Sequence, residues 1–116
     1  MTAATTLHYI YDPLCGWCYG AKPLIDAARE IVPVVAHSGG MMTGSHRRPV
    51  SAQLRDYVMP HDKRIAEHTG QVFGDAYFDG LLRDTSAVFD SAPPTTAVLA
   101  AEQLAGRGLE LLGRLQ

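Results

Sequence analysis

The chain has 116 residues, 47% of them hydrophobic and 19% charged, which suits one globular domain and excludes an intrinsically disordered chain. Its formal net charge of −2 leaves no positive excess to neutralise a nucleic-acid backbone, so we expect no nucleic-acid partner. No apolar run is long enough to span a membrane and no secretion signal begins the chain, so we expect a cytoplasmic protein without a membrane partner.

The first half of the chain predicts a strand, a helix and a second strand. Residues 6–11 alternate between two faces and are rich in aromatic and β-branched types, as strands are. Apolar residues at helical spacing predict a helix over 16–31, kinked at Pro23. The short apolar run 32–36 predicts a strand that is parallel to the first and buried on both faces. Together these elements form a βαβ unit, so the predicted fold class is α/β.

The next segment predicts two helices after a loop over 37–49. Ser51 can cap a first helix that Pro60 ends, since proline lacks the amide hydrogen a helix interior needs. Asp62 can cap a second helix that closes at residues 69–70. We find no strand after residue 36.

The last segment also predicts helices. Residues 75–82 indicate a weak helix, and Ser91 can cap a stronger one whose first turn contains two prolines. A last helical stripe of leucines follows, formed by Leu109, Leu112 and Leu115. We therefore divide the chain into a βαβ unit over 1–49 and a helical subdomain over 50–116.

Two paired strands make a marginal sheet, so something must complete this one. A second copy of the chain could do so, as a homodimer, or further residues of a longer fold could. The apolar helical pattern at the end of the chain favours the longer fold.

The only two cysteines, Cys15 and Cys18, form one C-x-x-C motif at the predicted junction of strand and helix. Free amides at a helix amino terminus favour a negative charge and lower the pKa of a thiol there. We expect Cys15 to be the more exposed sulfur, which attacks a disulfide, and Cys18 to resolve the mixed disulfide. Such a pair needs no metal or organic cofactor, because the electrons reside in the sulfurs.

Two other interpretations of the motif are zinc binding and a pair of buried small hydrophobic residues. The five histidines show no H-x3–5-H pair that would complete a zinc site, so we predict no metal. A C-x-x-C motif inside a βαβ unit is typical of thioredoxin-like redox proteins.

Four neighbours of the cysteines are candidates for substrate binding or for tuning the pair: Asp12, Pro13, Gly16 and Trp17. Trp17 could contact unfolded segments or cover the sulfur. Asp12 could pass a proton from Cys18 during resolution, or it could only form the turn before Pro13.

Residues 12–20, Asp-Pro-Leu-Cys-Gly-Trp-Cys-Tyr-Gly, resemble the active-site segment of DsbA-like, FrnE-type thiol–disulfide oxidoreductases of the thioredoxin-like superfamily. Residues 38–41, 68–74 and 90–93 resemble further segments of that family. The resemblance implies a thioredoxin-like domain with an α-helical insertion, and oxidoreductase or isomerase activity on protein thiols. It also implies closing strands and a cis-proline loop, and this chain ends before them. We therefore expect the N-terminal portion of the fold.

Two further functions stay open. The chain could be a truncated, dimeric module that senses redox state or binds a partner without turnover. It could also resemble glutathione-dependent isomerases and transferases, although related folds of that kind typically carry serine in place of the cysteine pair.

Overall fold

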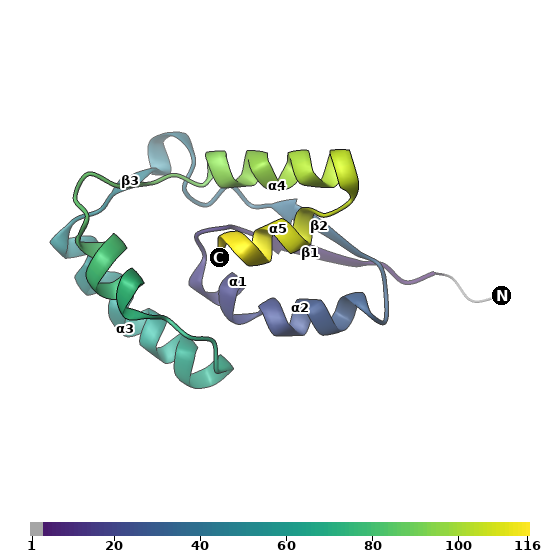
Figure 1. The fold of residues 1–116 in the computed structure, drawn as a ribbon, viewed down its shortest axis with the longest axis horizontal. Coiled ribbons are helices and arrows are strands. Elements are labelled where there is room, and N and C mark those ends of the chain that lie inside the picture. Colours follow the sequence, from purple (N-terminus) through teal and green to yellow (C-terminus); the bar gives the residue numbers. More distant parts are fainter. Residues whose placement is uncertain (1–3) are drawn as a thin grey trace.

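The computed structural model describes residues 4–116 and begins with a βαβ unit (Figure 1). Its elements are β1 (Leu7–Tyr11), α1 (Gly16–Gly20), α2 (Lys22–Arg29) and β2 (Val34–Ser38). The two strands are parallel, with Leu7 opposite Val34 and Tyr11 opposite Ser38. The predicted α/β class, the first strand and the parallel pairing are confirmed.

The helix predicted over 16–31 is two helices, which meet at Ala21. Pro23 lies in the first turn of α2, where its missing amide hydrogen has no helical partner to lose. The expected kink is therefore a new helix start. α1 remains a separate helix of 5 residues that carries Cys18.

The prediction that the second strand is buried on both faces is wrong. Val34 and Ala36 are partly buried, whereas Val35 and His37, on the other face, are exposed. The reason is tertiary, because the core residues of this region pack on the face that carries Tyr9 and Ala36. The strand also begins two residues later than residue 32, since Pro33 precedes it.

A short strand pair follows, which the sequence analysis did not predict. The 3-10 turn η1 (Gly44–His46) leads into β3 (Arg48–Pro49), which pairs antiparallel with β4 (Val88–Phe89). Strands of two residues are too short to show an alternating pattern.

One continuous helix, α3 (Ala52–Thr69), replaces the two helices predicted on either side of Pro60. Its ends are as expected, since the Ser51 hydroxyl accepts the amide hydrogen of Leu54 and Gly70 ends the helix with a φ of 77°. Leu54 is buried near one end and Ile65 near the other. We infer that this packing at both ends keeps the helix intact through the proline.

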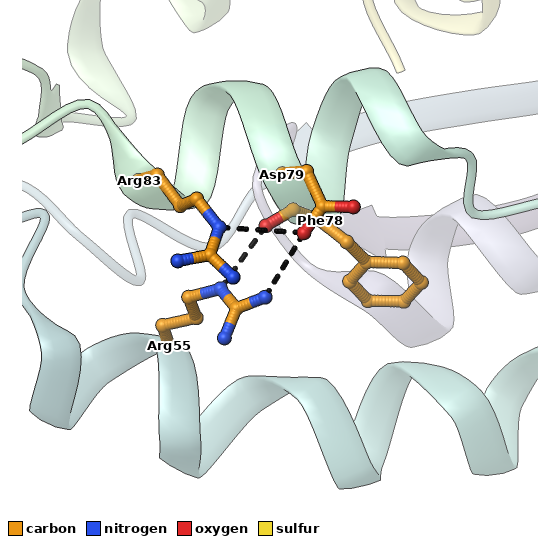
Figure 2. A network of polar contacts seen from close by, with 4 residues as sticks. All are labelled: Arg55, Phe78, Asp79 and Arg83. Atoms are coloured by element: carbon orange, nitrogen blue, oxygen red, sulfur yellow. Dashed lines mark hydrogen bonds and ion pairs between the residues drawn. The ribbon is translucent and has the colours of Figure 1, made fainter.

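The segment after α3 folds back onto it. A π-helical turn, η2 (Ala76–Gly80), runs into the 3-10 turn η3 (Leu81–Arg83), near the weak helix predicted over 75–82. Figure 2 shows the contact: Arg55 Nε donates to the Phe78 carbonyl at 3.1 Å, and both Arg55 and Arg83 reach Asp79. Because the ion pairs are exposed, the bond to the carbonyl is the better anchor.

The last two helices, α4 (Ala92–Ala105) and α5 (Gly108–Leu115), return to the β1–β2 sheet (Figure 1). Val98 of α4 and Leu112 of α5 form one core with Tyr11. A second core consists of Val50, Leu54, Leu82 and Phe89. The division at residue 49 stays a proposal, and helices that follow it pack against strands that precede it. In the described part of the chain, no helix combines the length and apolar character needed to cross a membrane.

Candidate redox site

The cysteine pair lies where the chain turns from β1 into α1. Cys15 is the residue just before α1, and its amide hydrogen bonds to the carbonyl of Asp12 at 3.1 Å. Cys18 lies inside α1. Both thiols are free and partly buried, and their side chains share a hydrogen bond.

The two thiols titrate as a pair. The hydrogen bond from Cys15 lowers the pKa of Cys18 to about 6, although burial opposes this shift. The same bond and burial raise the pKa of Cys15, while backbone hydrogen bonds from Cys18 and Trp17 act to lower it. The pair therefore gives up its first proton readily and holds the second.

The sequence predicts that free amides at the start of the helix lower the pKa of a thiol at this position. The backbone amides act to lower the pKa of Cys15, but its side-chain bond to Cys18 and its burial raise that pKa. Because one proton lies between the two sulfurs, its transfer from Cys15 to Cys18 exposes a thiolate on Cys15.

The two sulfurs face different spaces. Cys15 lines an open pocket of about 330 Å³, whereas Cys18 lines a crevice of about 10 Å³ that could not hold a substrate. Within the described residues, the larger pocket has no charged side chain in its lining, which includes Leu14, Tyr19, Phe73, Tyr77, Leu81 and Phe89. A substrate sulfur can therefore reach Cys15 more easily than Cys18.

Asp12 is buried, and its carboxylate fixes the turn before the cysteines. It accepts hydrogen bonds from the amides of Leu14 and Met41 and from the hydroxyl of Ser91, each at 2.9 Å. These donors come from the turn itself, the loop after β2 and the start of α4. The turn-forming role is thus visible in the contacts, and proton transfer to Cys18 stays a prediction.

The other three candidates also surround the pair. Pro13 and Gly16 line the larger pocket. Trp17 is 50% exposed, and its ring meets the ring of His68 edge-on, with 6.2 Å between the centroids. The exposure of Trp17 is compatible with contact to unfolded segments, and its position beside Cys18 is compatible with covering the sulfur. Both hypotheses for Trp17 therefore stay open.

No protein-family model and no curated protein matches this chain. Solved structures do. The cytosolic disulfide reductase DsbM from Pseudomonas aeruginosa with GSH is 65% identical, with a TM-score of 0.87, and the match covers 96% of this chain and 53% of that one. The chain is related to the DsbA-like, thioredoxin-fold oxidoreductases.

Two more solved structures are similar to this chain. A structure of DsbM from the same organism, described without GSH, is 66% identical over 96% of this chain and 52% of that one, with a TM-score of 0.87. A structure from Nitrosomonas europaea, provisionally assigned as a protein disulfide isomerase, has a TM-score of 0.80, covering 98% of this chain and 54% of that one. At 24% identity it supports the fold alone. The chain described here spans about half the length of each of these three proteins.

Two residues that the sequence analysis did not assign to the site lie beside it. The Tyr77 hydroxyl donates to Asp62 Oδ2 at 2.6 Å, and Tyr77 lines the same pocket as Cys15. Burial raises the pKa of Asp62, while the bond from Tyr77 lowers it. The sequence predicts only a helix cap for Asp62. Its spacing from the cysteines along the chain does not indicate that it bonds to Tyr77 beside the pocket.

Two glycines in α1, Gly16 and Gly20, allow this helix to pack closely against α3. A Cβ atom on Gly16 would lie 2.8 Å from Ile65 Cδ1 and 2.9 Å from Asp62 Oδ1. The residue after Cys15 is therefore constrained by packing. Across residues 4–116, no three His, Cys, Asp or Glu side chains gather as metal ligands would.

Proposed function

We propose that the DsbA-like chain performs thiol–disulfide exchange on protein thiols, with Cys15 as the attacking and Cys18 as the resolving sulfur. The observation that supports this most is the hydrogen-bonded pair of free cysteines, of which Cys15 alone lines the open pocket. The relationship to proteins named as a disulfide reductase supports the same chemistry.

In the reducing direction, the thiolate of Cys15 attacks one sulfur of a substrate disulfide. A mixed disulfide forms, and the other substrate sulfur leaves as a thiolate that takes up a proton. Cys18 then attacks the sulfur of Cys15, and the bond to the substrate breaks. The second substrate thiol is released, two electrons have passed to the substrate, and the pair remains as a disulfide.

The charge state of the reduced pair at neutral pH is suited to these steps. With the pKa of Cys18 near 6, the reduced pair carries one charge at neutral pH and retains one proton. The proton shared by the two sulfurs can move as the charge moves to Cys15. No prosthetic group takes part in these steps, since the electrons are held by sulfur.

The oxidised pair must be reduced again, and we propose a thiol of the cytosol as the reductant. Glutathione is a natural candidate, because one DsbM structure is described with GSH and DsbM is named cytosolic. The pocket beside Cys15 has, among its described lining residues, no charged side chain that could bind the carboxylates of glutathione. This favours protein disulfides, rather than glutathione disulfide, as the substrate. We therefore propose protein disulfides as the substrate and glutathione as the regenerating thiol.

Insulin reduction tests the proposal. Wild-type protein with glutathione should reduce insulin disulfides, and Cys15→Ser should abolish the reaction. Cys18→Ser should accumulate a mixed disulfide that a gel without reductant detects. Unchanged turnover in Cys15→Ser would contradict the assignment, and trapping by Cys15→Ser instead would exchange the two roles. A stable dimer without turnover would favour the redox-sensing module.

A further inference from the structure

Ser91 is a buried polar residue for which the sequence predicts only a helix cap. It is 0% exposed, and its hydroxyl donates to Asp12 Oδ1 at 2.9 Å, although 79 positions separate the two residues. The same hydroxyl accepts the amide hydrogen of Met42 at 3.1 Å. It makes no capping bond to α4, so the predicted cap has a different task.

The backbone of Ser91 also forms a hydrogen bond with the loop after β2. Its amide hydrogen bonds to the Met42 carbonyl at 2.9 Å, while the neighbouring Met41 amide donates to Asp12 Oδ2 at 2.9 Å. Ser91, the loop at Met41 and Met42, and the Asp12 carboxylate are thus joined by hydrogen bonds to one another. The position of Asp12 depends on α4 as well as on its own turn.

Asp12 in turn acts on Cys18. The carbonyl of Asp12 accepts the amide hydrogen of Cys15 at 3.1 Å, which holds Asp12 beside the pair. The backbone of Asp12 acts to lower the pKa of Cys18, and the charge of its carboxylate acts to raise it. Lys22 and Asp26 of α2 line the same crevice as Cys18, and they form an ion pair with each other at 2.6 Å.

The side chains of the other elements around Cys18 add no fixed charge. Tyr9 of β1 and Cys15 are the remaining titratable neighbours, and α5 contributes Leu109, Leu112, Gly113 and Gln116. Among residues 4–116, Asp12 has no cationic partner. The negative charge of the Asp12 carboxylate is therefore stabilised by its hydrogen-bond donors alone.

We propose that Ser91 is a positioning residue of the cysteine pair, which fixes and partly screens the Asp12 carboxylate and thereby sets how readily the pair ionises. The consequence for turnover rests on the proposed function, whereas the effect on ionisation does not.

The test is a pH titration of thiolate absorbance in the reduced protein, with a variant lacking both cysteines as the blank. Ser91→Ala should raise the midpoint by about half a pH unit, because the carboxylate loses a donor that disperses its charge. Asp12→Asn should lower the midpoint by about one unit, because the opposing charge is removed.

A double-mutant cycle separates this effect from simple loosening of the fold. In the Asp12→Asn background, Ser91→Ala should no longer move the midpoint. An equal shift in both backgrounds, or no shift in the wild-type background, would overturn the proposal. If Ser91→Ala does not fold, Asp12→Asn decides, and an unchanged or higher midpoint overturns it.

Thr96→Ala is the matched control on the same helix, since its hydroxyl bonds to the Ala92 carbonyl at 2.8 Å and is exposed. Its midpoint should equal that of the wild type. Absence of insulin reduction with the expected midpoint shifts would refute the proposed function and leave the role of Ser91 standing. Normal insulin reduction without the midpoint shifts would overturn the role of Ser91 and leave the proposed function standing.

Discussion

Gly16 shows how packing constrains a position between two reactive residues. A methyl group there would press on Ile65 Cδ1 and Asp62 Oδ1. We expect Gly16→Ala to lower the free energy of unfolding by about 1–2 kcal/mol, because α3 must move away from α1. Urea unfolding followed by circular dichroism measures this loss. Gly74→Ala is the control, since no atom lies within 4 Å of the added carbon. Equal stability of both variants would show that α3 yields without cost.

The bond between Tyr77 and Asp62 predicts a pH-dependent stability. Burial raises the pKa of Asp62 above its unfolded value, so its contribution to stability is present at low pH and is lost as the pH rises. Removing the Tyr77 hydroxyl removes a bond that lowers this pKa. Tyr77→Phe should therefore cost about 1–3 kcal/mol near neutral pH and less near pH 4.

Urea unfolding at the two pH values measures this difference. Tyr57→Phe is the control on α3, because Tyr57 is 60% exposed. A cost that is the same at both pH values would mean that the charge of Asp62 does not depend on Tyr77.

At the scale of the element, α3 predicts a gain from removing its proline. Pro60 lies inside the helix, is exposed and cannot donate to the carbonyl one turn earlier. Pro60→Ala should raise the free energy of unfolding by about 1–3 kcal/mol. Thermal unfolding measures the gain. Pro94→Ala should change little, because Pro94 lies in the first turn of α4. No gain from Pro60→Ala would imply that the proline aids the packing of Leu54 and Ile65.

At the scale of the whole molecule, one face of the β1–β2 sheet is uncovered among the described residues. Ile10 is 72% exposed there, beside the exposed pair His8 and His37, whose ring nitrogens are 2.9 Å apart. Apolar sheet surface of this kind promotes association. Ile10→Thr, which keeps a β-branched side chain, should weaken any concentration-dependent self-association in sedimentation velocity. Leu104→Gln on α4 is the control. A wild-type chain that stays monomeric at every concentration would contradict the homodimer.

The sequence supported predictions wherever the signal was local. The alternation in residues 6–11, the capping of α3 by Ser51 and Gly70, and the prolines opening α4 each depend on a few neighbouring residues. The cysteine motif and its place after the first strand were equally local. The helix break at Pro60 failed because packing at both ends of α3 outweighed the local cost of proline.

By itself, the sequence determined the βαβ unit, the cysteine pair and the relationship to thioredoxin-like proteins, because these follow from periodicity and short motifs. Only the tertiary structure decided which sulfur meets the open pocket and that Ser91 bonds to Asp12. Burial and hydrogen bonding between segments up to 79 positions apart set these properties, and no pattern along the chain encodes such contacts.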